Sequence, residues 1–193
     1  MAAIPVSTER PSPKRDHLVA TAWRLFYRDG YRAVGIDTIL AEADVAKMTL
    51  YNHFKSKDDL IVAVLEKRSR EVLDAMRLAA AKERPGSPRQ LLAVFDWLAG
   101  FCQNDDFKGC AFIRALSEFP ELDHPVHQAA WRHKEGMREV LIELTRSAGV
   151  KDPTALAEAL RLLIDGALVT AHATGSPAPA LRAKSAAALL IKA

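Results

Sequence analysis

The segment Gly35–Lys57 constrains the fold of this chain most strongly. Its sequence, GIDTILAEADVAKMTLYNHFKSK, predicts two short helices joined by a tight turn, with a third helix starting directly afterwards. In the first helix, apolar residues recur at the spacing of one buried face: Ile36, Ile39, Leu40 and Ala43. Asp44 follows where this period breaks, and its side chain suits both the turn and the cap of the next helix.

The second helix of this segment has an apolar side and a polar side. Leu50 and Phe54 lie four residues apart and are expected to pack inward, together with Val45. The other side carries hydrogen-bonding and long side chains: Lys47, Met48, Thr49, Tyr51, Asn52 and His53. Such a helix fits the major groove of DNA, where base edges present donors and acceptors. We therefore expect this segment to be a DNA-binding helix-turn-helix.

These residues resemble the DNA-binding signature of the TetR family of bacterial transcriptional regulators. The resemblance rests on TLYNHFKSK at Thr49–Lys57, on Asp58-Asp59-Leu60 after it, and on the preceding pattern Asp37-x-Ile39-x-x-x-Ala43-x-Val45. Its specific motifs cover roughly residues 14–65. Over the rest of the chain only the all-helical pattern and the length are similar. The resemblance implies a homodimer that binds operator DNA and a small-molecule effector.

Phosphate contacts position such a protein on DNA, and base contacts specify the sequence. By resemblance, phosphate contacts are assigned to Tyr51, His53 and Lys57, with Thr49 shared between phosphate and base. Thr38, in the first turn of its helix, is a further phosphate candidate. For direct base readout, the side-chain chemistry favours four residues: Lys47, Met48, Thr49 and Asn52. Gly35 stands where family members often carry a hydroxyl, so that contact is not expected here.

Composition favours an all-α fold for the 193 residues. Alanine and leucine dominate, strand-like runs of Val, Thr and Tyr are missing, and 49% apolar with 26% charged residues is typical of a globular chain. No apolar run approaches the ~18–20 residues of a membrane span. Met1–Pro13 lacks the apolar core of a signal peptide, so a cytoplasmic location is expected. The net charge of +3 falls entirely within residues 1–57, which is compatible with a nucleic-acid face.

The proline-rich start and the helical patterns of the sequence predict three parts. These are a flexible N-terminal arm at 1–13, a DNA-binding domain at 14–60, and a helical effector-binding and dimerisation domain at 61–193. The arm and its border contain Arg10, Lys14 and Arg15, which either contact phosphates or belong to a solvated tail. A long helix over Lys57–Lys82 is expected to cross the domain boundary as a rigid lever. Further helices are expected at Gln90–Cys102, Gly109–Phe119, Val126–Ala148, Pro153–Thr174 and up to Ile191.

An effector pocket is implied in the second domain by the resemblance. The apolar and aromatic side chains that can line it are Met76, Phe95, Trp97, Phe101, Phe112, Phe119 and Trp131, with Met137, and the polar groups are His127, Arg114 or Glu118. The alternative for each of these residues is ordinary core packing. The effector is expected to be apolar or aromatic.

The helix at Pro153–Thr174 carries an apolar stripe that predicts a dimer interface with the final helix. Its residues are Leu156, Leu160, Leu163, Ile164, Ala167, Leu168 and Ala171, and the alternative is an intrachain core helix. Dimerisation is favoured because two reading helices must meet successive major grooves.

Other chemistry has little support in the sequence. Cys102 and Cys110 are too few for a disulfide framework, although a thiol switch between them is conceivable. His124, His127 and His133 lack the spacing of a metal site. No cofactor is expected, and no catalytic motif indicates an enzyme. We therefore predict a ligand-responsive repressor. The alternative is a small-molecule-binding or sequestering protein whose DNA contact is vestigial.

Overall fold

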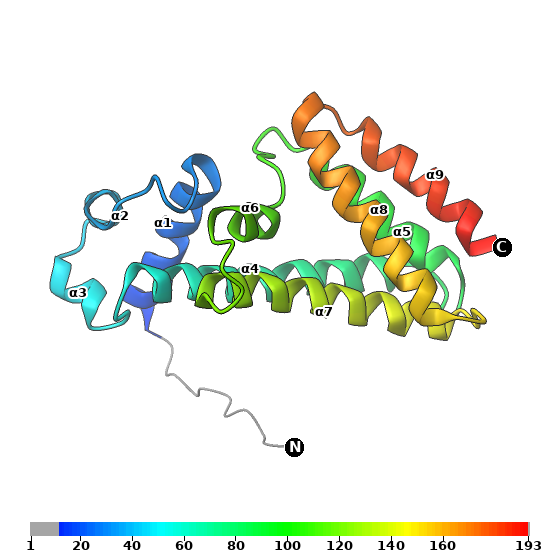
Figure 1. Ribbon diagram of the computed structural model, residues 1–193, viewed down its shortest axis with the longest axis horizontal. Helices are drawn as coiled ribbons and strands as arrows, with labels where there is room; N and C mark the ends of the chain where they lie inside the picture. The colour runs from blue at the N-terminus through cyan, green and yellow to red at the C-terminus, as the bar shows by residue number, and fades with distance from the viewer. Residues whose placement is uncertain (1–11, 193) are drawn as a thin grey trace, which may run out of the picture. The chain divides into compact units, whose positions relative to one another are not determined.

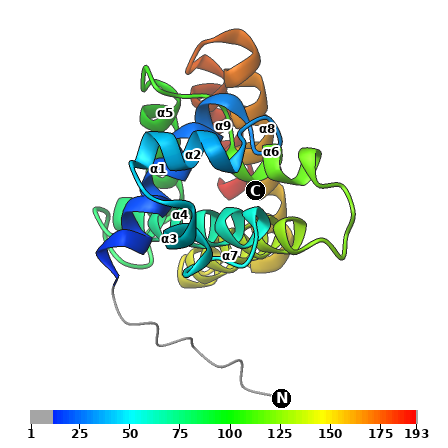
Figure 2. The ribbon, with the colours of Figure 1, turned by 90° about the vertical axis from the view of Figure 1, so that its left-hand side faces the viewer.

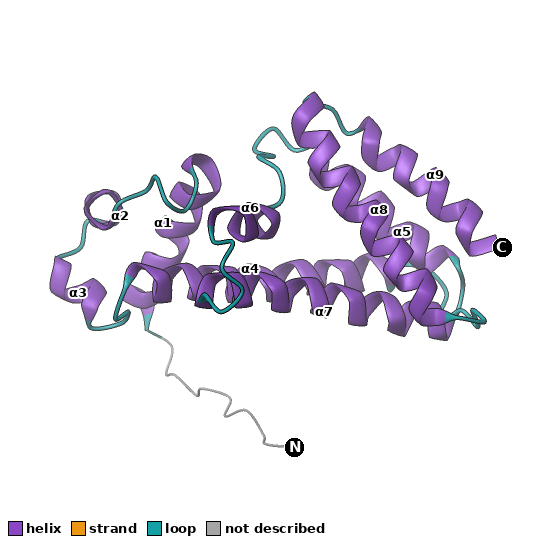
Figure 3. Ribbon diagram, viewed as in Figure 1, coloured by secondary structure: helices purple, strands orange, loops and turns teal. Residues whose placement is uncertain are grey.

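The computed structural model describes residues 12–192, which form α-helices and no strand (Figure 3). The arm expected at 1–13 lies outside the described residues, except for its last two. The chain folds as two compact units, one ending at Val64 and the other beginning at Leu65. Every helix of the described part falls short of the length or apolarity that a bilayer crossing requires.

The first unit contains α1 (Pro13–Asp29), α2 (Ile36–Ala43), α3 (Lys47–Tyr51) and the start of α4 (Lys57–Ala80). Ser12 caps α1 by accepting the N–H of Arg15, and Gly30 ends it with a positive φ of 97°. Leu18, Leu25 and Phe26 of α1 are buried. α1, α2 and α3 each contact the other two, so α1 forms the support on which α2 and α3 are held.

The second unit contains the rest of α4 and five further helices: α5 (Arg89–Cys102), α6 (Ala111–Glu118), α7 (Pro125–Ser147), α8 (Pro153–Thr174) and α9 (Ala178–Lys192). In Figures 1 and 2, α9 lies beside α8 and α5, and α8 crosses α7. Leu91, Phe95, Leu141, Leu160 and Ile164 belong to the core among these helices. The all-α fold expected from the sequence is confirmed.

A close approach joins α4 to α7 inside the second unit. A Cβ on Gly136 of α7 would lie 2.9 Å from a methyl carbon of Leu73 on α4. Real Cβ atoms essentially never come so near another heavy atom, so a larger residue at this position would require the end of the Leu73 side chain to move. Arg132 and Glu66 form an ion pair of 3.4 Å between the same helices.

Candidate nucleic-acid interface

The helix-turn-helix forms as expected, with differences at two helix ends. Asp44 adopts a left-handed conformation with φ 50° and caps the C-terminus of α2, whereas Ala46 occupies the N-cap of α3 without a side-chain hydrogen bond. Asp44 therefore shapes the turn but does not cap the second helix. α3 is also shorter than the pattern suggested and ends at Tyr51.

The early end of α3 has a local cause. His53 and Phe54 both donate their N–H to the carbonyl of Leu50, which closes the last turn. The N–H of Lys55 then goes to the carboxylate of Asp59 at 3.0 Å, while Ser56 accepts the N–H of Asp59 at 3.1 Å. These two bonds form the start of α4. Asn52 and His53 consequently lie just beyond α3.

The inward side of this segment is packed largely, though not completely, as the sequence predicted. Ile39 and Leu50 are fully buried, Phe54 is 4% exposed and Ala43 is 3% exposed. Ile36 and Val45 are only half-buried. The apolar spacing therefore identified the residues that hold α2 and α3 in place.

Two contacts from α1 fix the turn and the reading helix. His17 donates from Nε2 to the carbonyl of Ala43 at 3.0 Å, at the end of α2. The guanidinium of Arg15 lies over the ring of Phe54, 5.3 Å from its centroid. Both contacts connect residues that are 26 or more positions apart, and neither could be found from local sequence patterns.

The outward side presents the predicted DNA-contacting residues together. Thr38, Lys47, Met48, Tyr51 and Asn52 are exposed. Thr49, His53 and Lys57 are half-buried. Met48 is 69% exposed and Tyr51 is 44% exposed, which is unusual for large side chains that could pack in a core. Their exposure fits a surface that meets a partner.

Two of the lysines on this surface are already oriented. The ammonium of Lys57 donates to the carbonyl of Arg32 at 3.2 Å, and that of Lys47 lies 4.0 Å from the carboxylate of Asp37. Lys47 and Asp37 are both largely exposed, so this pair contributes little stability. The surface thus combines exposed apolar and hydrogen-bonding groups with two lysines that have partners within the chain.

The residues expected to line one effector pocket lie in different parts of the second unit. Met76 and Phe95 are fully buried in the core of the second unit, with Trp97 and Phe101 packed half-buried against it. Phe112 and Phe119 are buried on α6 and just after it, and His127 donates to the carbonyl of Phe119 at 2.8 Å. Trp131 is 46% exposed.

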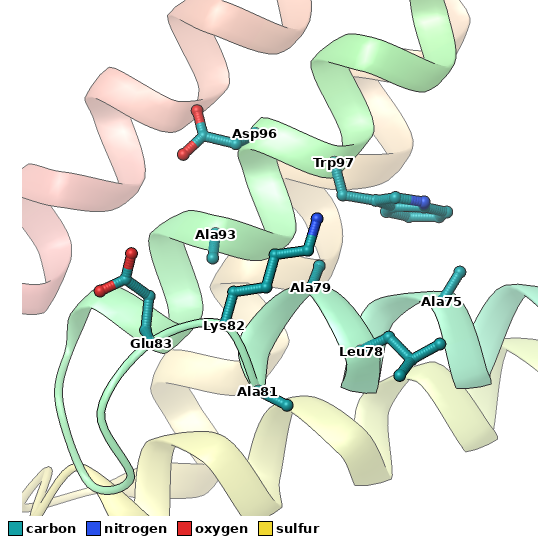
Figure 4. A pocket seen from close by; sticks show the side chains of 9 residues that line it. All are labelled: Ala75, Leu78, Ala79, Ala81, Lys82, Glu83, Ala93, Asp96 and Trp97. Atoms are coloured by element: carbon teal, nitrogen blue, oxygen red, sulfur yellow. The ribbon is translucent and has the colours of Figure 1, made fainter.

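A groove of about 830 Å³ lies between the end of α4 and α5 (Figure 4). Alanines form much of its lining, with Trp97 and Leu78 at one end and charged groups near the other: Ala75, Leu78, Ala79, Ala81, Lys82, Glu83, Ala93, Asp96 and Trp97. The Lys82 side chain extends across it toward α5. Of the residues expected to line an effector pocket, Trp97 alone lines this groove.

The predicted dimer stripe is largely covered by the chain itself. Leu160, Ile164, Ala167, Leu168 and Ala171 are buried in the core, and Leu156 and Leu163 pack half-buried against it. Other apolar side chains of α8 and α9 are exposed instead: Leu162 by 64%, Val169 by 52%, Leu181 by 52%, Leu189 by 71% and Leu190 by 42%. The helical spacing of apolar residues could not show which side of α8 faces the core, because both sides of the helix are apolar.

A buried polar cluster of the second unit was missed by sequence reasoning. Lys134 on α7 is 2% exposed and donates to Asp165 of α8 at 2.6 Å. The neighbouring His133 is 2% exposed, and burial lowers its pKa to about 3, with a smaller contribution from the charge of Lys134. Lysine and histidine normally lie on the polar side of a helix, so only the three-dimensional packing identifies them as buried. Within the described residues, no three metal-ligating side chains gather as a metal site.

Comparisons with known proteins agree on one family. Residues 18–64 match the model described as bacterial regulatory proteins, tetR family. A TetR-family transcriptional regulator from Streptomyces coelicolor is 32% identical, and its crystal structure superposes with a TM-score of 0.87 over 93% of this chain and 94% of that one. The transcriptional regulator YjdC of Escherichia coli is 24% identical over 80% of this chain and 81% of its own length. The repressor NemR of the same species is 26% identical over 66% of this chain and 64% of its own.

Proposed function

Because this chain belongs to the TetR family of bacterial transcriptional regulators, whose members are not enzymes, we propose that it is a ligand-responsive repressor acting as a homodimer on a palindromic operator. The observation that carries the proposal is the outward surface of α3 and its flanks, with exposed Lys47, Met48, Tyr51 and Asn52 above a buried apolar side. The cytoplasm, where the operator is, is its proposed location. The boundary in the sequence between the DNA-binding domain and the effector domain is proposed near residue 60.

We assign different roles to the residues of this surface. Asn52 matches the donor and acceptor pair of adenine, Lys47 matches the acceptors of guanine, and the Met48 side chain suits a thymine methyl. Thr38, Tyr51, His53 and Lys57 are assigned to phosphates, with Thr49 serving both. Lys57 is placed well for this task, since it lies at the N-terminus of α4, where the helix dipole also favours an anion.

The dimer interface is proposed on the outward sides of α8 and α9. A shallow trough of about 370 Å³ runs between these helices, and small residues such as Gly166, Ala183 and Ala186 line it. Exposed Leu162 and Leu189 stand on the same two helices. A second copy related by a two-fold axis can place such a leucine in the trough, which covers apolar surface on both copies. Leu163 and Ala167 of the predicted stripe also line this trough.

Repression is proposed to end when an apolar or aromatic effector binds the second unit. The groove beside Trp97 is the candidate site, because it combines an apolar lining with a few polar groups at its edge. An effector that binds better to the form with low operator affinity shifts the population toward that form. α4 begins in the DNA-binding unit and ends at this groove, so one continuous helix is available to report the change.

The test of the proposal is binding of the purified protein to the DNA that flanks its own gene. A duplex of the same composition with scrambled sequence is the control. Tight binding to the natural duplex alone supports a regulator. Equal and weak binding to both duplexes favours a small-molecule-binding protein without a DNA function.

A further inference from the structure

An acidic side chain stands beside a lysine on the outward surface of the helix-turn-helix. Asp37, in the first turn of α2, has a side chain that is 91% exposed, and its carboxylate lies 4.0 Å from the ammonium of Lys47. Lys47 is the first residue of α3, and its side chain is 62% exposed. The two charged groups are therefore accessible to a partner, and they come from different helices.

Stability explains little of this arrangement. An ion pair between two largely exposed side chains contributes little to folding. An acid in the first turn also favours the positive end of α2, but that role needs no neighbour on α3. A phosphate contact is closed to Asp37, because an ionised carboxylate only accepts hydrogen bonds and repels an anion. On DNA, the carboxylate of Asp37 can therefore bind only a group that donates.

The major groove presents two such donors, the N4 amino group of cytosine and the N6 amino group of adenine. Beside cytosine N4 lie O6 and N7 of the paired guanine, two adjacent acceptors that suit an ammonium. An A·T pair instead places the adenine donor between two acceptors, N7 and thymine O4, so a carboxylate there also meets a repelling oxygen. A lysine and an aspartate side by side therefore match a G·C pair best.

We propose that Asp37 and Lys47 together read one G·C base pair of the operator. Lys47 donates to O6 and N7 of guanine, and Asp37 accepts a hydrogen bond from the N4 amino group of cytosine. O6 and N4 are joined by a hydrogen bond and lie about 3 Å apart. This separation is close to the 4.0 Å between the ammonium and the carboxylate. The inference rests on the proposed function, and it adds a residue of α2 to base readout.

Repulsion of DNA phosphates is the other effect that an exposed carboxylate has on this surface. Repulsion lowers the affinity for every sequence alike, so removing the carboxylate would strengthen all binding. Base reading has the opposite consequence on the operator, because the loss of Asp37 removes a hydrogen bond to cytosine. The direction of the change in operator affinity therefore separates the two roles.

The experiment begins with selection of duplexes from a random pool by the unmodified protein. Fluorescence anisotropy then measures the affinity of the unmodified protein, Asp37→Ala and Lys47→Ala for the selected operator and for its single-base-pair variants. We expect Asp37→Ala to bind the operator about fivefold more weakly and to lose most of its preference at one G·C pair. Lys47→Ala should lose its preference at the same pair. Because the Asp37 side chain is 91% exposed, its replacement leaves the core unchanged.

Glu42→Ala is the matched control, because Glu42 is another exposed acid of α2, 3.5 Å from Arg24 of α1. This variant should keep every base preference. If it loses the same preference, the loss of charge alone explains the effect and the proposal fails. Tighter or unchanged binding of Asp37→Ala to the operator, or a preference lost at a different base pair from that of Lys47→Ala, would also overturn it. A protein that enriches no sequence from the pool contradicts the proposed function itself, and the joint reading with it.

Discussion

Ser69 on α4 and His133 on α7 are joined by a hydrogen bond of 3.0 Å between Oγ and Nδ1. The same imidazole stacks on Phe112 of α6, with 3.5 Å between the ring centroids. A single buried side chain therefore connects three helices of the second unit. Burial lowers the pKa of His133 from 6.5 to about 3, so the connection is built from the neutral ring.

This connection predicts a loss of stability in mild acid. Below the unfolded value of 6.5 the unfolded chain binds a proton at His133, whereas the native chain does not until about pH 3. The contribution of His133 is therefore complete above pH 6.5 and decreases as the pH falls, by about 1.4 kcal/mol per unit. Urea unfolding at about pH 7 and about pH 5 should show a smaller decrease for His133→Gln than for the unmodified protein. Identical decreases would contradict a neutral, buried histidine.

Two lysine–aspartate pairs of the second unit should differ strongly in their importance. Asp165→Asn leaves the 2% exposed Lys134 without its carboxylate and should lower the free energy of unfolding by about 3–5 kcal/mol. Asp96→Asn removes the partner of Lys184, in a pair whose side chains are 35% and 57% exposed, and should cost about 0–1 kcal/mol. Chemical denaturation of both variants measures the difference. Similar costs would mean that Lys134 reaches water.

The proposed dimer interface predicts a specific effect of filling the trough. A Cβ on Gly166 would meet nothing within 4 Å, so Gly166→Leu is tolerated by the single chain but occupies the space proposed for a partner. Gly100→Leu is the matched control, since Gly100 on α5 is equally open and exposed. Light scattering at micromolar concentration should show a dimer for the unmodified chain and for Gly100→Leu, and a monomer for Gly166→Leu. A dimeric Gly166→Leu protein places the interface elsewhere.

The reading surface predicts two kinds of DNA-binding defect. Tyr51→Phe and Lys57→Ala should weaken binding to operator and random DNA alike, and Lys57→Ala should reduce the salt slope by about one. Asn52→Ala should cost about 1–3 kcal/mol on the operator and relax the preference at one base pair. Anisotropy titrations on operator and single-base variants separate these outcomes. Equal loss on all sequences for Asn52→Ala would remove it from base readout.

Local sequence patterns were sufficient for the helices and for most of the buried side of the helix-turn-helix. The spacing of Ile39, Leu50 and Phe54 identified the buried side of the helix-turn-helix, and proline placed the start of α8 at Pro153. Patterns could not show which apolar side of α8 faces the core, because Leu160 and Leu162 look alike in sequence but are 0% and 64% exposed. The contact of Lys134 on α7 with Cys110, which precedes α6, joins residues 24 positions apart, so it depends on packing alone.

The most direct test of the central claim is fluorescence anisotropy with the duplex that flanks the protein's own gene, against a scrambled duplex, at about 50 mM and about 200 mM salt. We expect tight binding to the natural duplex, weak binding to the scrambled one, and affinities for both that fall as salt increases. Equal weak binding to the two duplexes at both salt concentrations would contradict a sequence-specific regulator of this gene.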